Sequence, residues 1–273
     1  PTHAPAELRL AGRLPLGRAG EAAWQRERFA IETLRDIART HPLFADGLPE
    51  PRFTALDFAA APWHLQGSLG PLYRRADTDW LLILVVPKVK QSGAALSIER
   101  GARSAHFGQR VPVFLQWLLR QLQEPKQPVR VCLLQVEEED GWTAQLDAFN
   151  QAWVSAWQRQ DAARIASLRQ ELLSRLHDLL QRYVDAQHRR RWYFPRTSWQ
   201  AITKPESKWL THWQGQGGEL HSDGGYAALW SRDVELADDP TAMQALIDFA
   251  EELMHCLWID PDAIPDAEPE VSR

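Results

Sequence analysis

Seven consecutive apolar residues, Trp-Leu-Leu-Ile-Leu-Val-Val at positions 80–86, constrain the fold more than any other part of the chain. The run is far shorter than the ~20 residues that a membrane-spanning helix needs. It is rich in leucine and β-branched residues, and Pro87, which cannot donate a ladder hydrogen bond, follows directly. Such a run is typical of a central strand that is covered on both faces of its sheet. We therefore expect a soluble globular chain built around a buried sheet.

The segments around this run predict a helix-strand-strand-strand-helix-strand order. Apolar residues at spacings of seven, three and four indicate an amphipathic helix before the strands. Alternating apolar positions favour a strand just before the central run. Pro112 is expected at the first position of the second helix, where its missing N–H costs nothing. The expected elements are a helix at 22–39, strands at 53–59, 63–73 and 80–86, a helix at 112–122 and a strand at 129–136.

After Gly141 the chain is expected to be helical. Apolar residues repeat at spacings of three and four over 165–183 and again over 243–257. Residues 189–239 between them lack this period, and so long a loop in a compact domain usually is functional or contacts a partner. The expected organisation is a single domain at 14–258, with an α/β core at 20–137, a helical extension at 142–258 that includes the loop 189–239, and a flexible tail at 259–273. Because the chain starts at Pro1 rather than Met, we expect a fragment of a longer protein.

Composition and known motifs exclude several classes of function. The net charge is −5, so any contact with nucleic acid must use a local basic patch. Cys132 and Cys256 are too few for a disulfide scaffold or a four-thiolate metal site, which fits a reducing cytoplasm. The sequence contains no zinc-protease motif, nucleophile elbow or Walker loop. We therefore expect a cytoplasmic protein without a metal, a cofactor or a membrane contact.

The order of elements resembles that of the PD-(D/E)XK nucleases, which have a restriction-endonuclease-like fold. Their Mg²⁺-dependent hydrolysis needs one acid on the second strand and another two residues before a lysine on the third. The corresponding stretch of the second strand ends at Gly70 without an acid, and the third strand has Val85 or Val86 at its acid position. Only Lys88 is retained. We therefore expect a nuclease-like fold in which Gly70, Val85 and Lys88 are vestigial positions and no residue is catalytic.

Several segments resemble the C-terminal domain of the RecC family, the gamma subunit of exodeoxyribonuclease V. They include Leu14-Pro-Leu-Gly17, the Pro87-Lys88 exit from the central strand, Tyr193-Phe-Pro-Arg-Thr-Ser-Trp199, and the tail segment from Gly224 to Arg232. Their order and spacing span residues 14–258. The chain departs from the family pattern by lacking an arginine-rich Tyr-Arg-Pro-Gly-Lys strand exit and the two preceding helicase-like domains.

This resemblance implies a noncatalytic role in double-strand break repair and recombination. RecC joins the helicase-nuclease RecB and the helicase RecD in an ATP-dependent complex that processes DNA ends. The expected partners are therefore RecB-like and RecD-like subunits together with double-stranded DNA ends and forked DNA. The expected contributions of this domain are DNA binding, duplex splitting and subunit docking.

Two basic groups are candidates for DNA contact. Arg189, Arg190 and Arg191 stand beside Trp192 and Tyr193, and such a cluster can pair with phosphates and stack on bases. The same arginines also suit a positively charged helix C-terminus that complements the helix dipole. Lys88 and Lys90 would lie at the vestigial groove, where they either touch a DNA backbone or are ordinary solvated lysines.

Tryptophan accounts for 13 residues and concentrates in the C-terminal half. Most of these rings are expected in the core, but some should contact partner subunits, where tryptophan is enriched. The candidates for a partner interface are Trp199, Trp209, Trp213 and Trp230. Core packing alone is the other interpretation.

Two further functions remain open on the sequence. One is an active PD-(D/E)XK nuclease whose acids have moved to Asp57, Asp77 or Asp79. The other is an interaction module with no role on DNA. Acids that converge within ~5 Å on one face of the sheet would favour the enzyme, whereas a groove free of acids would favour the scaffold.

Overall fold

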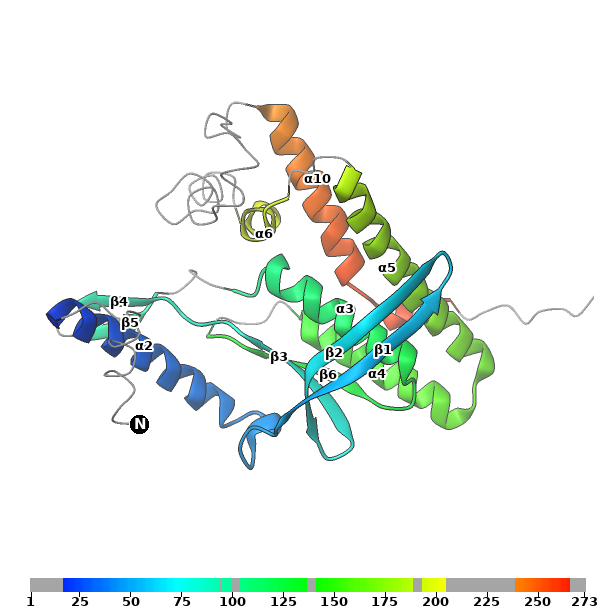
Figure 1. Cartoon of the computed structure of the whole chain (residues 1–273), viewed down its shortest axis with the longest axis horizontal. Coiled ribbons are helices and arrows are strands. Elements are labelled where there is room, and N and C mark those ends of the chain that lie inside the picture. The colour runs from blue at the N-terminus through cyan, green and yellow to red at the C-terminus, as the bar shows by residue number, and fades with distance from the viewer. Residues whose placement is uncertain are drawn as a thin grey trace, which may run out of the picture.

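A four-stranded mixed sheet forms the centre of the computed structural model (Figure 1). The structure describes residues 17–93, 95–99, 104–136, 141–188, 193–204 and 239–265. The sheet order is β1-β2-β3-β6, in which β1, β2 and β3 are antiparallel neighbours and β6 runs parallel to β3. The strands are β1 (Pro51–Ala60), β2 (Trp63–Arg75), β3 (Thr78–Leu84) and β6 (Val129–Leu134).

Strand β3 is the central strand that the apolar run predicted, and it is covered on both faces. Its side chains alternate between two cores, with Leu81 and Ile83 in the larger core and Trp80 in the smaller one. The neighbouring β6 repeats this alternation, placing Val131 in the larger core and Cys132 in the smaller one. Because successive side chains of a strand point to opposite faces, the two cores lie on opposite sides of the sheet.

Helices supply the cover on each side. Helix α2 (Gly17–Ala38) lies against the smaller core, where Leu34 and Ala38 are buried. Helices α3 (Phe107–Gln123) and α4 (Trp142–Arg159) lie against the larger core. The expected helix-strand-strand-strand-helix-strand order is therefore present in the described part of the chain, within a mixed α/β architecture, but two further short strands lie between β3 and α3.

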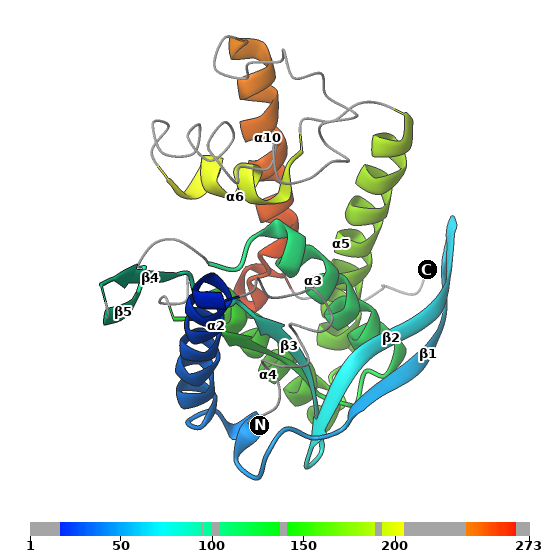
Figure 2. The same ribbon diagram turned by 60° about the vertical axis from the view of Figure 1, so that its left-hand side comes forward.

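Three more helices extend the larger core: α5 (Ala162–His188), α6 (Pro195–Thr203) and α10 (Pro240–Leu257). Figure 2 shows α6 crossing α10, with α5 beside them. Leu172 of α5 and Leu253 of α10 belong to the same cluster of buried residues as β3 and β6. No helix in the described ranges is long and apolar enough to cross a bilayer.

Helix α3 begins five residues before the proline that was expected to start it. His106 caps the helix: its Nδ1 accepts a hydrogen bond from the Gly108 N–H at 3.2 Å, and the Gln109 side chain accepts one from the His106 N–H. This reciprocal capping box satisfies free N–H groups of the first turn. Pro112 therefore lies inside α3, where one internal hydrogen bond is missing, and its expected place at the first helical position is wrong.

A hairpin and a helix in the described part of the chain were not expected. A short hairpin of β4 (Val89–Ser92) and β5 (Ala95–Ile98) follows the central strand and lies beside α2 (Figure 1). Helix α6 falls within 189–239, which was expected to be irregular. Pro195 starts α6 as its first residue, a position that favours proline, so this part of the expectation is wrong.

The start of the expected tail is folded. Ile259 is fully buried, and residues Pro261–Ala263 form a short 3-10 helix, η3. The Arg164 guanidinium of α5 donates a hydrogen bond to the Ile264 carbonyl at 2.6 Å. These contacts anchor residues 259–264 to the helices, so the expected flexible tail does not begin at 259.

Candidate functional site

Strands β2 and β3 are paired only near the turn that joins them, from Tyr73↔Trp80 to Arg75↔Thr78. Further from this turn the two strands are not paired. Helix α3 approaches the opening between them, where Gln116 Oε1 accepts a hydrogen bond from the Gly70 N–H at 2.9 Å. Gly70 therefore lies beside the opening between the strands. This is the region in which the nuclease resemblance places an acid on the second strand.

No side chain fits at Gly70. Its φ is +139°, a conformation that residues with a Cβ rarely adopt. A Cβ there would lie 2.6 Å from the Arg52 carbonyl oxygen and 2.9 Å from Phe53 Cδ1. The sequence has no aspartate at this position, and the local backbone would not accommodate one.

The second expected acid position is occupied by a buried valine. Val85 is only 4% exposed and belongs to the larger core. Its N–H donates to the Leu134 carbonyl at 2.9 Å, which continues the parallel pairing of β3 and β6. Val85 also borders the small pocket described below. A carboxylate in its place would still lose most of its contact with water, at a desolvation cost.

Lys88 and Lys90 are held by the hairpin. Their ammonium groups lie 3.1 Å and 3.3 Å from carboxylate oxygens of Glu99. The hydrogen bond from Lys88 is the main reason why the pKa of Glu99 lies below its usual value. Both lysines remain more than half exposed, and neither lines the pocket at the end of β3 described below.

The three alternative acids do not converge. Asp57 lies on β1 opposite Gln66, and its carboxylate contacts His64 at 2.6 Å. Asp79 lies on β3 opposite Arg74, which is eight residues further along β2 than Gln66. At the usual rise of a strand, eight residues span about 25 Å. Asp77 lies in the exposed turn before β3.

The carboxylate of Asp79 accepts hydrogen bonds from two arginines. Arg74 Nε lies 3.0 Å from one of its carboxylate oxygens, and Arg120 Nη2 lies 2.8 Å from the other. Among the described residues, no group of three or more His, Cys, Asp or Glu side chains is placed to hold a metal ion.

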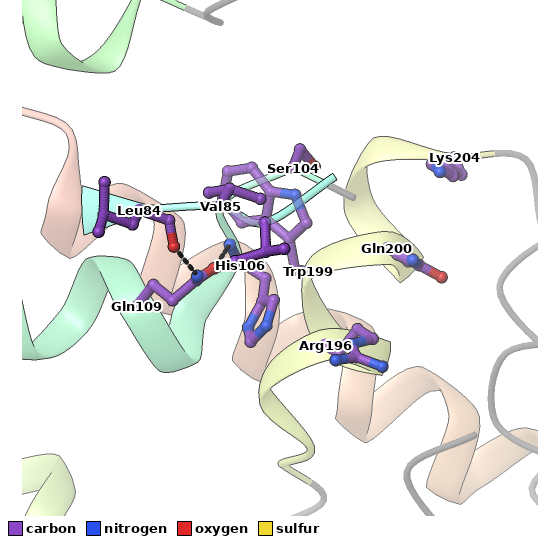
Figure 3. A pocket seen from close by; sticks show the side chains of 10 residues that line it. Leu84, Val85, Ser104, His106, Gln109, Arg196, Trp199, Gln200 and Lys204 are labelled. Carbon is purple, nitrogen blue, oxygen red and sulfur yellow. Dashed lines mark hydrogen bonds between the residues drawn. The ribbon is translucent and has the colours of Figure 1, made fainter. Parts of the chain in front are cut away.

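A small pocket of about 200 Å³ opens at the carboxyl end of β3 (Figure 3). Its walls come from the end of β3, the start of α3 and one side of α6. None of the described side chains that line it carries a carboxylate. Its polar lining consists of Ser104, His106, Gln109, Arg196, Gln200 and Lys204.

Helix α6 aligns three of these polar side chains. Arg196, Gln200 and Lys204 are four residues apart, so they follow one face of α6 and its C-cap. Arg196 and Lys204 bring two positive charges to the pocket, with the Gln200 amide between them in sequence.

The ring of His106, which lines the same pocket as Arg196 and Lys204, is neutral. Burial, and secondarily the charges of Arg196 and Arg110, lower its pKa from 6.5 to about 4. Since Nδ1 accepts the Gly108 N–H, the single proton of the neutral ring lies on Nε2. At neutral pH His106 therefore supplies an N–H donor in the lining of the pocket.

A third cation packs against Trp199, which lines the pocket. Arg110 is 1% exposed, and its guanidinium carbon lies 4.3 Å from the centre of the Trp199 ring and 4.9 Å from that of Trp142. Its Nε donates to the Ala105 carbonyl at 3.0 Å. Arg110 adds positive charge near the pocket wall formed by Trp199.

The candidate interface residue Trp199 is part of the domain's own core. Its ring is 4% exposed and packs edge-on against Phe107, with the ring centres 5.2 Å apart. It therefore offers almost no surface to a partner, and the expectation for this residue is corrected. The other expected interface residues, Trp209, Trp213 and Trp230, and the basic cluster Arg189, Arg190 and Arg191 lie outside the described residues.

The sequence did not single out His106, Arg196, Gln200 or Lys204 as site residues. Two signals were present: Pro195, which marks a helix start, and the four-residue spacing from Arg196 to Lys204. The proximity of these residues to His106 depends on long-range packing, which no local pattern contains.

Together the fold and the site define a mixed α/β domain whose central sheet ends at a pocket lined by cations. The family model of the RecC C-terminal domain matches residues 2–206, and the chain belongs to this family. The resemblance to the gamma chain of exodeoxyribonuclease V, a DNA repair and recombination protein, is thereby confirmed. No curated protein matches the chain.

Proposed function

We propose that this chain is a noncatalytic domain that contacts DNA and docks partner subunits in a RecBCD-type helicase-nuclease. Membership of the RecC C-terminal domain family supports a role in DNA repair and recombination. The observation that carries the noncatalytic assignment is the pair of acid positions, where Gly70 has no room for a side chain and Val85 is buried in the core.

A degenerate PD-(D/E)XK core accounts for this arrangement. The mixed sheet, the parallel β3-β6 pair and the early divergence of β2 from β3 support that assignment. In such a core, hydrolysis needs carboxylates that hold Mg²⁺ beside the scissile phosphate. We propose that this domain has kept the scaffold without metal, cofactor or catalytic residue, and that it works in the cytoplasm as one unit over 14–258.

The proposed partners are RecB-like and RecD-like subunits, double-stranded DNA ends and forked DNA. Family membership supports these partners. The proposed DNA-contacting residues from the sequence are Arg189, Arg190, Arg191, Lys88 and Lys90. The ion pairs of Lys88 and Lys90 with Glu99 weaken the case for these two lysines. Duplex splitting is proposed as an activity of the assembled complex.

Binding of the full chain to a labelled forked duplex, measured by fluorescence anisotropy over a range of salt concentrations, tests the DNA contact. We expect an affinity that falls steeply with salt, because each phosphate contact releases condensed counterions. Replacing Arg189, Arg190 and Arg191 by glutamate should weaken binding and flatten the salt dependence. The DNA-contacting function would be contradicted if the wild-type chain did not bind at low salt.

A further inference from the structure

A groove lies between the end of strand β1 and helix α5, at the far end of the β1–β2 hairpin (Figure 2). Its volume of about 460 Å³ is within the ~300–1,000 Å³ of typical ligand sites. Trp63 at the start of β2 connects the two walls. Its ring packs edge-on against His177 of α5, and its Nε1–H donates a hydrogen bond to His177 Nδ1 at 3.4 Å.

The groove follows the free edge of β1. Four consecutive residues, 58–61, line it. Because successive side chains of a strand point to opposite faces, a continuous run of lining residues places the groove along the edge of the strand rather than under one face. β1 is the outermost strand of its sheet, so no other described strand pairs with this edge.

Two residues of this edge have main-chain groups without a partner. The Ala55 carbonyl points away from β2, because it accepts a hydrogen bond from Gln123 Nε2 at the end of α3. The direction of main-chain groups alternates along an antiparallel strand, so those of Asp57 and Ala59 point to the same free edge. Within the described ranges, no residue bonds to them on that side. Such an edge is a template for another strand.

The lining combines apolar side chains with a single cation. Phe58 and Ala60 from β1 and Leu173 and Leu176 from α5 form its apolar part. Arg169 is the one Arg, Lys, Asp or Glu side chain among the described lining residues, and it forms no ion pair with a described side chain. A carboxylate next to apolar side chains therefore complements this groove.

We propose that an extended segment of a partner subunit, with an acidic side chain next to apolar ones, adds to the free edge of β1 in this groove. Asp57 and Ala59 supply N–H and C=O groups to the added strand, and Arg169 pairs with its carboxylate. Alternate side chains of the added strand enter the apolar part. This inference rests on the proposed function, because it assigns a surface to the docking of subunits.

The chemistry of the groove favours a peptide over a nucleic-acid strand. A row of free main-chain N–H and C=O groups matches the main chain of another strand. A nucleic-acid strand gains its affinity from several phosphate contacts, whereas the described lining offers one arginine.

Hydrogen–deuterium exchange tests the main-chain contacts. The full chain is co-purified with a RecB-like and a RecD-like subunit, and exchange is read at single residues by mass spectrometry. The amides of Asp57 and Ala59 should exchange at least about tenfold more slowly in the complex than in the chain alone, because each gains a hydrogen bond. The amide of Phe58, which is directed towards β2, is the internal control and should be slow in both states.

Three variants of the full chain test the same contacts by affinity for the partner subunits. Ala59→Pro removes an edge N–H but no hydrogen bond to β2, and Arg169→Glu reverses the charge of the groove. Each should weaken association at least about threefold. Arg26→Glu reverses an exposed charge on α2, across the sheet, and should leave the affinity unchanged. Thermal unfolding checks each variant, and Arg169→Glu carries the test if Ala59→Pro unfolds.

Four results would overturn the proposal. Assembly with unchanged exchange at Asp57 and Ala59 would do so and leave the docking function standing. Protection of these amides by oligothymidine alone would assign the groove to nucleic acid. Protection that grows with the concentration of the chain alone would assign it to a second copy. If the chain assembles with neither subunit, the proposed docking function fails together with this inference.

Discussion

Arg120 donates two hydrogen bonds to one carboxylate oxygen of Asp79, from Nε at 3.2 Å and from Nη2 at 2.8 Å, and both side chains are buried. Arg74 donates to the other oxygen of Asp79. The cluster joins the start of β3 to α3 and to the end of β2. Asp79, which the sequence left open as a relocated metal ligand, is thus engaged in holding the sheet to its helix.

Substitution of Asp79 should therefore reduce stability. Asp79→Asn removes the buried carboxylate that pairs with Arg120 and leaves the half-exposed Glu124, 2.6 Å from Arg120 Nη1, as the remaining carboxylate partner. Breaking a buried ion pair costs about 3–5 kcal/mol, and the ion pair with Glu124 places the expected loss at the lower end of this range. Asp57→Asn is the control, because its contact with His64 is exposed and worth less than about 1 kcal/mol. Urea unfolding gives both values. Similar stability losses in the two variants would contradict the structural role of Asp79.

The backbone at Gly70 gives a second prediction. Gly70→Ala should lower the unfolding free energy by about 2 kcal/mol, because it combines a strained φ with a contact of 2.6 Å to the Arg52 carbonyl. Gly67→Ala is the matched control: its φ is also positive, at +154°, but no atom lies within 4 Å of the added Cβ. Thermal or urea unfolding should therefore show a larger loss at Gly70. Equal losses would mean that space at Gly70 is not limiting.

Acid should destabilise the domain through His106. Its pKa is about 4 in the folded protein and near 6.5 when unfolded. The unfolded chain therefore binds more protons between pH 6.5 and 4, so the unfolding free energy falls as the pH is lowered through this window. We expect a loss of about 2 kcal/mol, less than the full shift because the ring is partly exposed.

The His106→Asn variant isolates this contribution. Asparagine keeps a capping side chain but does not titrate, so the difference in stability between wild type and variant should change between pH 7 and pH 4.5. His41, whose pKa is also lowered by burial, is present in both proteins and cancels. A pH-independent difference would show that His106 does not titrate in this window.

The tryptophan-rich segment gives a prediction about assembly. Trp199→Ala should destabilise the domain by about 3–5 kcal/mol, because it deletes a large buried ring. Among Trp209, Trp213 and Trp230, we expect at least one alanine variant that stays folded and weakens association with a RecB-like or RecD-like subunit. Co-purification and unfolding of each variant distinguish the two effects. Normal assembly in all three would place the docking surface elsewhere.

The fold was largely readable from the sequence, because the strongest local signals agree with the packing. The run at 80–86 predicted a two-sided central strand, and β3 alternates between two cores as such a strand must. The start of α3 was missed because a histidine supplied the cap, outside the usual set of Ser, Thr, Asp and Asn.

The site was harder to predict than the fold. From the sequence, Gly70 and Val85 were predicted to be vestigial acid positions, but a missing acid does not show which side chains occupy the space. His106 and Lys204 are almost a hundred residues apart, and they line one pocket only because α6 packs against the start of α3. Such proximity is a property of tertiary packing, which local periodicity does not encode.

The most direct test of the central claim is a nuclease assay of the full chain on linear duplex and single-stranded DNA with Mg²⁺ or Mn²⁺. We predict no cleavage above the background of a mock preparation, because Gly70 and Val85 cannot provide metal ligands. Lys88→Ala, which removes the only retained residue of the nuclease pattern, should behave like the wild type. Metal-dependent cleavage by the wild-type chain that Lys88→Ala abolishes would contradict the noncatalytic assignment.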